Sequence, residues 1–240
     1  FNADSSSNLL FTSDHNGSAI PTKLKNLGVP LNELRRHVSY DIGIDAVAHA
    51  LSARFNATLI VANYSRLVID CNRHPGSAGS IPSVSDNTVV PGNKNLSDDD
   101  IKSRENEIFD AYHSSVGNRI SIMRSENKNP ILISLHSFTP VIGGQFRPWE
   151  IGILFKDDER LSAPLINKLR EQKDLNIGDN KPYSGSEPAG YTVDYHVEPL
   201  SLPSVAVEFR QDLIEFETGA VRWANIFGDA LDHVLTAKIS

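Results

Sequence analysis

Short apolar runs recur along the chain, and longer stretches with a helical period separate most of them. Because most of the runs are apolar throughout and end at turn-forming residues, we interpret them as strands buried on both faces of a sheet. These runs predict strands within residues 9–12, 57–70, 130–138, 149–155 and 201–213. The 57–70 segment is expected to bend near Asn63 and Tyr64 and to form a second short strand that ends at Asp70.

Apolar residues spaced three and four apart predict helices over residues 31–55, 96–125, 161–172 and 212–236. In the second of these helices Ser97 is suited to the N-cap and acidic residues fill the first turn, and both features favour a helix start. Residues 74–98 show neither period and are rich in Gly, Ser, Pro and Asn. We expect an ordered loop there, because loops of that length inside compact domains are often functional.

The alternation of buried strands with helices indicates an α/β fold. We predict three layers, α/β/α, with a mixed, largely parallel sheet covered by helices on both faces. The chain has 240 residues and is 40% hydrophobic, which is enough for a sizeable core. No internal repeat or linker divides it, so residues 1–240 are expected to form a single domain.

Composition narrows the class of function. The formal net charge is −7, whereas a protein that neutralises a phosphate backbone needs a surplus of Lys and Arg, so we expect no nucleic-acid partner. We expect no membrane partner either, since no apolar run is long enough to cross a bilayer. Cys71 is the only cysteine, which excludes an internal disulfide and favours a cytoplasmic location.

Polar side chains follow the predicted strands at the points where the strands end. His15 follows "LLFTSD", the 66–73 segment surrounds "LVID", His136 follows "ILISL" and Glu208 follows "SVAV". In open α/β sheets ligands bind beyond the carboxyl ends of the strands. We therefore expect these residues, distant in sequence, to converge on one site.

The residue types at these ends suggest a hydrolytic metal site. Two histidines and one carboxylate would leave a zinc ion an open position for water, and Glu208 would suit the general base. Arg66, Asn72 and Arg73 could bind a substrate carboxylate, and a guanidinium can also stabilise a developing oxyanion. Each residue also has a plainer interpretation: the histidines as hydrogen-bonded core residues, and the arginines as partners of acids such as Asp70.

With these residues assembled, the sequence resembles the N-formylglutamate amidohydrolase family. The motifs that carry the resemblance cover most of the chain: "SDHNGSAIP", "YDIGID", "YSRLVIDCNR", "VVPGNKNLS", "SLHSFTP", "RPWEIGILF" and "VEFRQDL". The resemblance implies a phosphorylase/hydrolase-like fold, shared with zinc carboxypeptidases and aspartoacylases. It also implies a zinc-dependent amidohydrolase domain that cleaves the N-acyl amide of an acidic amino acid, such as N-formyl-L-glutamate, a small-molecule substrate.

The relation to aspartoacylases assigns roles to the polar residues. It makes His15 and His136 metal ligands, Glu208 the catalytic base and Arg66 a catalytic residue that stabilises the oxyanion, with Asn72 and Arg73 matching the substrate-binding "Asp-x-Asn-Arg" element.

The third metal ligand is less obvious, because Ser18 stands where aspartoacylases have the Glu of H-x-x-E. Asp41 in "YDIGID" is the first choice, because the family carries an Asp there, and Asp14 is the second. A further alternative is a site with only two protein ligands that binds metal weakly or not at all.

Four further residues have weaker assignments. Arg147 and Arg210 are candidates for substrate binding. Arg147 could instead pack on Trp149, and Arg210 could instead neutralise Glu208, whose side of the strand it should share. Asn93 is expected to serve turn chemistry, and Cys71 to fill space in the core.

Two other functions remain open. One is a zinc deacylase or carboxypeptidase-like enzyme that acts on a larger N-acyl, peptide or cell-wall substrate. The other is a non-catalytic carboxylate-binding protein. The size of the pocket, which the 74–98 loop would help to set, separates the first from hydrolysis of a formyl amide.

Overall fold

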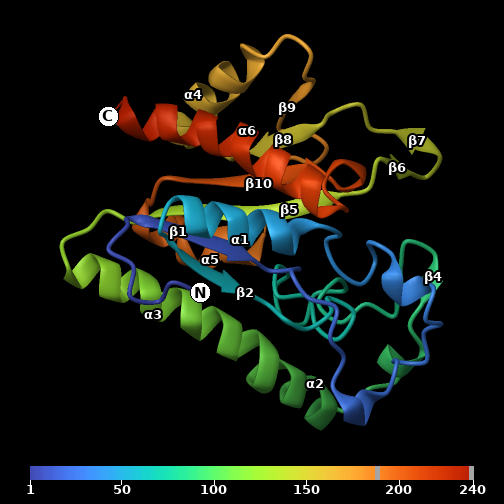
Figure 1. The fold of residues 1–240 in the computed structure, drawn as a ribbon. Helices are drawn as coiled ribbons and strands as arrows, with labels where there is room; N and C mark the ends of the chain where they lie inside the picture. Colours follow the sequence, from blue (N-terminus) through green and yellow to red (C-terminus); the bar gives the residue numbers. More distant parts are fainter. Residues whose placement is uncertain (187–189, 238–240) are drawn as a thin grey trace.

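A computed structural model describes residues 1–186 and 190–237, which build a six-stranded sheet in the order β2-β1-β5-β10-β8-β9 (Figure 1). The strands are β1 (Leu9–Ser13), β2 (Thr58–Val61), β5 (Ile131–Phe138), β8 (Ile151–Leu154), β9 (Ile177–Asp179) and β10 (Ser204–Arg210). The first four strands in that order are mutually parallel, whereas β8 and β9 run in the opposite direction. The predicted mixed, largely parallel sheet is confirmed.

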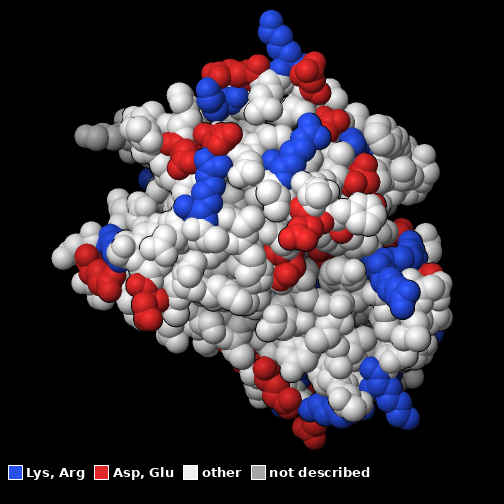
Figure 2. Space-filling model, viewed as in Figure 1, with Lys and Arg blue, Asp and Glu red and all other residues white. Residues whose placement is uncertain are grey.

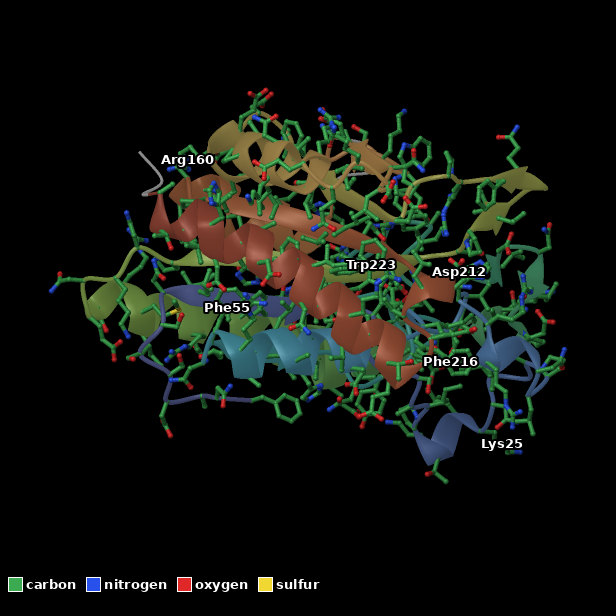
Figure 3. The ribbon with its side chains drawn as sticks, turned by 45° about the horizontal axis from the view of Figure 1, so that its top comes forward. Lys25, Phe55, Arg160, Asp212, Phe216 and Trp223 are labelled. Carbon is green, nitrogen blue, oxygen red and sulfur yellow. The ribbon has the colours of Figure 1, made fainter. Side chains whose placement is uncertain are left out.

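Helices cover both faces of the sheet (Figure 1). One face carries α1 (Ile44–Arg54), α4 (Glu159–Arg170) and α6 (Glu217–Thr236), and the other carries α2 (Asp98–Arg104), α3 (Asp110–Ser125) and α5 (Tyr191–His196). Each face has its own apolar cluster. Trp223 of α6 is buried in the first cluster and Phe55, just after α1, packs against that cluster (Figure 3). The three-layer α/β/α architecture follows the prediction.

Shorter elements lie in the connections. Two hairpins of two-residue strands are β3 (Val84–Ser85) with β4 (Thr88–Val89), and β6 (Val141–Ile142) with β7 (Gln145–Phe146). A π-helical segment, Glu105–Phe109, joins α2 to α3. Short 3-10 turns occupy Thr22–Leu24, Glu33–Arg35, Pro91–Asn93, Glu198–Leu200 and Gln211–Leu213. Ser97 is the N-cap of α2, as predicted, and it also forms a capping box with Asp100.

The predicted helix over 31–55 is wrong in its first half, since α1 begins only at Ile44. Gly43 precedes it with φ +80°, and a side chain at this position would meet the Ile214 carbonyl oxygen. Only glycine fits such a conformation and such a close approach. The chain can therefore turn there, and Asp41 stays outside the helix.

The predicted strand that ends at Asp70 is also wrong. After β2 the chain makes one isolated bridge at Tyr64, and residues 66–68 form a turn. Leu67, Val68 and Ile69 are nonetheless buried, in the cluster on the α3 side of the sheet. The apolar run reflects a buried turn, in which the backbone hydrogen bonds are local rather than in a ladder.

Figure 2 shows basic and acidic side chains interspersed over the visible face rather than gathered by sign. That face has no extended basic surface of the kind that a phosphate backbone requires. Among residues 1–186 and 190–237, no helix combines the length and the apolar character needed to cross a bilayer.

Candidate metal and active site

The carboxyl ends of three neighbouring strands bring the predicted residues together. His136 on β5 and Glu208 on β10 are direct partners in the parallel register, and His15 follows the end of the adjacent strand β1 by two residues. All three side chains are buried and line one cavity. The expectation that these strand ends converge is confirmed.

Asp41 reaches the histidines through a backbone contact. Its N–H donates to the carbonyl oxygen of His15 at 2.9 Å, which holds the segment before α1 against the end of β1. Its Oδ2 lies 3.1 Å from His136 Nδ1 and 3.6 Å from His15 Nδ1. Ligand atoms around a tetrahedral zinc ion are about 3.3 Å apart. His15, Asp41 and His136 thus form a buried group that could hold a metal ion.

The outer nitrogen of each imidazole has a partner that orients the ring. His15 Nε2 donates to Asp70 Oδ1 at 2.7 Å, and His136 Nε2 lies 3.0 Å from the Ser134 hydroxyl. Both arrangements leave Nδ1 facing Asp41. Histidines that ligate metals typically donate their other N–H to a carboxylate or a similar acceptor. The donor set and its outer contacts therefore fit a divalent metal such as zinc.

Asp14, the alternative third ligand, is turned the other way. Its Oδ1 accepts hydrogen bonds from the Tyr112 hydroxyl and from Thr192 Oγ1. Its Oδ2 lies 3.7 Å from His136 Nε2, whereas Asp41 faces His136 Nδ1. Of the two acids, Asp41 fits the metal geometry.

The acids and bases of the site shift one another's pKa. Burial disfavours a charge on His15, yet Asp70 and Asp41 outweigh burial and the repulsion from Arg66, and they raise its pKa to about 9. Burial likewise disfavours a charge on His136, but its contact with Asp41 raises the pKa. The pKa values of Asp41 and Asp70 are lowered, because the neighbouring cations outweigh the opposing effect of burial. Without a metal, the site is built to hold positive charge.

Glu208 has the properties of a proton acceptor. Burial raises the pKa of Glu208 to about 7, with a further contribution from Asp41 and opposition from His136. Its Oε2 has no hydrogen-bond partner among the described residues. A general base works best when its pKa lies near the operating pH. Glu208 can therefore exchange a proton with a molecule in the cavity.

Arg66, Asn72 and Arg73 line the same cavity. Arg66 contacts both acids of the metal corner, with Nη2 2.9 Å from Asp70 Oδ2 and Nη1 3.5 Å from Asp41 Oδ1. Arg73 donates to the Asn72 carbonyl oxygen at 2.8 Å. The cavity wall thus presents two guanidiniums and an amide beside the candidate metal site.

Arg147 and Arg210 do not line the cavity, although both were candidates for substrate binding. The guanidinium of Arg210 contacts Asp212 at 2.8 Å and Glu150 at 3.5 Å, so surface acids hold it. Arg147 stacks on the Phe138 and Tyr183 rings rather than on Trp149, and donates to the Tyr183 hydroxyl at 3.0 Å.

Tyr183 itself lines the cavity, and nothing in its sequence context marks it. Burial raises the pKa of its hydroxyl, and the charge of Glu208 adds to that shift. Its hydroxyl is therefore neutral at physiological pH and available as a hydrogen-bond donor, with Arg147 behind it.

A buried network supports the loop that carries Arg66 and Asn72. Asn93 donates to the Leu67 carbonyl oxygen at 2.8 Å, and Arg104 donates to the Val68 carbonyl oxygen at 2.9 Å and to Asn93 Oδ1 at 2.7 Å. Asn93 thus bridges segments distant in sequence, which differs from the local turn chemistry predicted for its side chain. Arg104 was not identified from the sequence, where it resembles an ordinary charged residue of a helix.

Cys71 is buried within the apolar cluster on the α3 side of the sheet, and burial raises the pKa of its thiol well above the usual value. A nucleophilic cysteine needs a lowered pKa. The prediction that Cys71 fills space in the core fits this environment.

Comparison with known proteins adds independent findings. The model of a family described as FGase, N-formylglutamate amidohydrolase, matches residues 7–215. The crystal structure of a gene product from Agrobacterium tumefaciens is similar, with a TM-score of 0.95 and 32% sequence identity, over 99% of this chain and 94% of that one.

The structure of an N-formylglutamate amidohydrolase from Ralstonia eutropha JMP134 has a TM-score of 0.74 and 18% identity to this chain, over 96% of this chain and 94% of that one. At that identity the likeness concerns the fold alone. No curated protein sequence matches this chain.

Proposed function

The chain belongs to the N-formylglutamate amidohydrolase family, and we propose that it is a metal-dependent hydrolase of the N-acyl amide of an acidic amino acid, such as N-formyl-L-glutamate. The observation that carries this proposal is the convergence of His15, Asp41 and His136 beside Glu208, in a cavity that Asn72 and Arg73 also line. The interpretation of residues 1–240 as one amidohydrolase domain, located in the cytoplasm, is part of the same proposal.

His15, Asp41 and His136 are the proposed metal ligands. A divalent ion held by them would supply Lewis acidity, which polarises the acyl carbonyl and activates water for attack. Two imidazoles and a carboxylate suit zinc, and they also suit iron, cobalt or manganese. Zinc is our choice on the grounds of the family resemblance.

Glu208 is the proposed general base and acid. It takes a proton from the attacking water as the new C–O bond forms, and returns a proton to the amine nitrogen as the C–N bond breaks. N-formyl-L-glutamate would yield formate and glutamate. In the metal-free site burial raises the pKa of Glu208 to about 7, and a carboxyl group in such an environment can both accept and return a proton near neutral pH.

Arg73 and Asn72 are placed to bind the substrate carboxylate, and Arg66 to stabilise negative charge on the acyl oxygen. Arg66 is partly exposed to the cavity while Asp41 and Asp70 fix its guanidinium. A residue held in this way loses little freedom when it stabilises a transition state. The Tyr183 hydroxyl is a further donor at the same cavity.

The test is release of formate from N-formyl-L-glutamate by the purified protein supplied with zinc, beside a sample treated with a chelator. We expect release that the chelator abolishes and that added zinc restores. No release, combined with binding of N-formyl-L-glutamate in the absence of stoichiometric metal, would contradict the proposal and favour a carboxylate-binding protein.

A further inference from the structure

The cavity is larger than the proposed substrate needs. Its volume is about 640 Å³. Cavities of about 300–1,000 Å³ typically enclose drug-sized ligands, and N-formyl-L-glutamate is much smaller than those. The metal corner and the residues proposed to bind the carboxylate account for only part of the lining. The rest of the cavity requires its own explanation.

The unexplained part follows strand β10 away from Glu208. Side chains two residues apart on a strand point to the same face, and Glu208, Ala206 and Ser204 all line the cavity. At about 3.3 Å per residue, these positions span about 13 Å. The cavity therefore extends from the catalytic residues toward the start of the strand.

Small side chains make the floor of this extension. In the sheet register Ala206 lies between Ser134 on β5 and Leu154 on β8, and all three line the cavity. The next row toward the strand ends contains His136 and Glu208. Because Ser134 and Ala206 are short, space opens directly beside the row that carries the chemistry.

The opposite wall of the extension is apolar. Val193 on α5, Val197 just after it and Leu202 before β10 all line the cavity, and they belong to or pack against the apolar cluster on the α3 side of the sheet. Together with Leu154 and Ala206 they form a predominantly hydrocarbon surface. Such a surface favours an alkyl chain over a charged group, because burying an unpaired charge is costly.

Charged residues of the extension lie where it reaches the protein surface, and four of them are paired, while Asp157 is exposed to solvent. Lys156 Nζ lies 2.7 Å from Glu198, and Arg160 binds Asp158. In Figure 3 Arg160 and Asp212, which follows the carboxyl end of β10, lie on opposite sides of the view. The distal end is therefore a solvated rim, open to the continuation of a long chain.

We propose that this extension is a subsite for an N-acyl group longer than formyl, a linear, largely apolar acyl chain of several carbons. We call it the acyl groove, defined by Ser134, Leu154, Val193, Val197, Ser204 and Ala206. The inference rests on the proposed function, since it takes the metal corner as the place where the acyl carbonyl reacts. It predicts that N-acyl-L-glutamates with medium-length chains are better substrates than N-formyl-L-glutamate.

The first experiment compares N-formyl-, N-acetyl-, N-butyryl- and N-hexanoyl-L-glutamate as substrates of the zinc-loaded protein. Each buried methylene is worth about fourfold in affinity, and hexanoyl has four methylenes more than acetyl. We therefore expect kcat/KM to rise by at least about tenfold from acetyl to hexanoyl, the gain from burying two of the four. A value that falls steadily as the acyl group lengthens, while formyl is hydrolysed, would overturn the acyl groove and leave the proposed function intact.

A binding series separates the two proposals. Calorimetric titration of the same four compounds into zinc-loaded Glu208→Gln protein measures affinity without turnover. Affinity that rises with chain length, in a protein whose wild type hydrolyses none of the compounds, would support the groove and contradict the proposed function. Affinity that is flat or falls with chain length would overturn the groove.

A variant tests the location of the subsite. Ala206→Leu places a larger side chain on the floor, and we expect the ratio of hexanoyl to formyl kcat/KM to fall at least tenfold. Ala206→Ser, at the same position with almost the same volume, should keep the wild-type ratio. A ratio that Ala206→Leu leaves unchanged, in protein that binds zinc like the wild type, would contradict this placement.

Discussion

Two pairs of buried histidines lie on the same side of this sheet, and they differ in what surrounds them. His15 with His136, and His113 with His196, have ring centroids 5.2 Å apart in each pair. All four residues are at most 5% exposed. Spacing and burial therefore do not distinguish a candidate metal site from a structural pair.

The carboxylates make the difference. Asp41 and Asp70 contact the first pair and raise the pKa of His15 to about 9. In the second pair, His113 donates to the Cys71 carbonyl oxygen at 2.7 Å and its Nδ1 lies 3.0 Å from His196 Nε2. There burial prevails and lowers the pKa of both residues, that of His196 to about 4. The carboxylates stabilise positive charge at the first pair. The second pair consists of neutral rings that join α3, α5 and the loop before Asn72.

The largest effect is expected from variants that disrupt one histidine pair at a time. His136→Gln removes a proposed ligand and should abolish metal-dependent turnover, whereas His196→Gln should retain it. The measurement is formate or acyl release by zinc-supplemented protein, with circular dichroism to confirm folding. Loss of turnover in both folded variants to the same extent would mean that the pairs do not differ in function.

A second variant separates holding the metal from the chemistry beside it. Glu208→Gln keeps the shape of the side chain but removes the proton acceptor, so we expect kcat to fall about 10²- to 10⁴-fold. Zinc stoichiometry should stay at the wild-type value, because Glu208 is not among the proposed ligands. A rate near that of the wild type would show that another group is the base.

Asp70→Asn sharpens the comparison by removing charge while keeping a hydrogen-bond acceptor beside His15. Partners of this kind are typically worth about 10- to 100-fold in metal affinity, and we expect a loss in that range. Asp194→Asn is the matched control, because Asp194 pairs with His74 at 2.9 Å outside the metal corner. Competition with a chromogenic chelator measures both affinities, and equal values would contradict the role of Asp70.

The smallest expected effect is a change in the free energy of unfolding with pH. An unfolded histidine titrates near pH 6.5, whereas His196 in the folded protein titrates near pH 4. As the pH falls from about 6.5 toward 4, the unfolded chain binds a proton that the folded chain excludes, so stability is lost over this window. In urea unfolding, wild type should therefore lose more stability than His196→Gln between these two pH values. An equal loss would mean that the second pair is not neutral in the folded state.

In metal-free protein the contribution of His15 to stability should change with pH in the opposite direction. Its folded pKa lies above the unfolded value, so its contribution to stability is complete below about pH 6.5 and is lost as the pH rises toward 9.

Much of the fold follows from the apolar pattern, because strands buried on both faces have few alternatives. The pattern failed at residues 64–70 and 31–43 because tertiary packing, rather than the local sequence, decides the backbone conformation there. Leu67, Val68 and Ile69 are buried in a turn, and an apolar run reports burial rather than backbone conformation. The late start of α1 depends on the close approach of Gly43 to Ile214, which is a tertiary contact.

The candidate site was predictable where a residue lies near the carboxyl end of a strand, as His136 and Glu208 do, since topology alone brings these strand ends together. Asp41 required the family resemblance, because it reaches His15 from an irregular segment. Tyr183 and Arg104 could not be found in this way. Tyr183 reaches the cavity from a connection after β9, and Arg104 acts through carbonyl groups whose positions only the folded chain defines.

The most direct test of the account is a titration of metal-free protein with Co²⁺, followed by the visible absorption of the bound ion. We predict one equivalent bound by the wild type and by His196→Gln, and a loss of that stoichiometric site in Asp41→Asn. Stoichiometric binding that persists unchanged in Asp41→Asn, or that disappears in folded His196→Gln, would contradict the assignment of His15, Asp41 and His136 as the metal site.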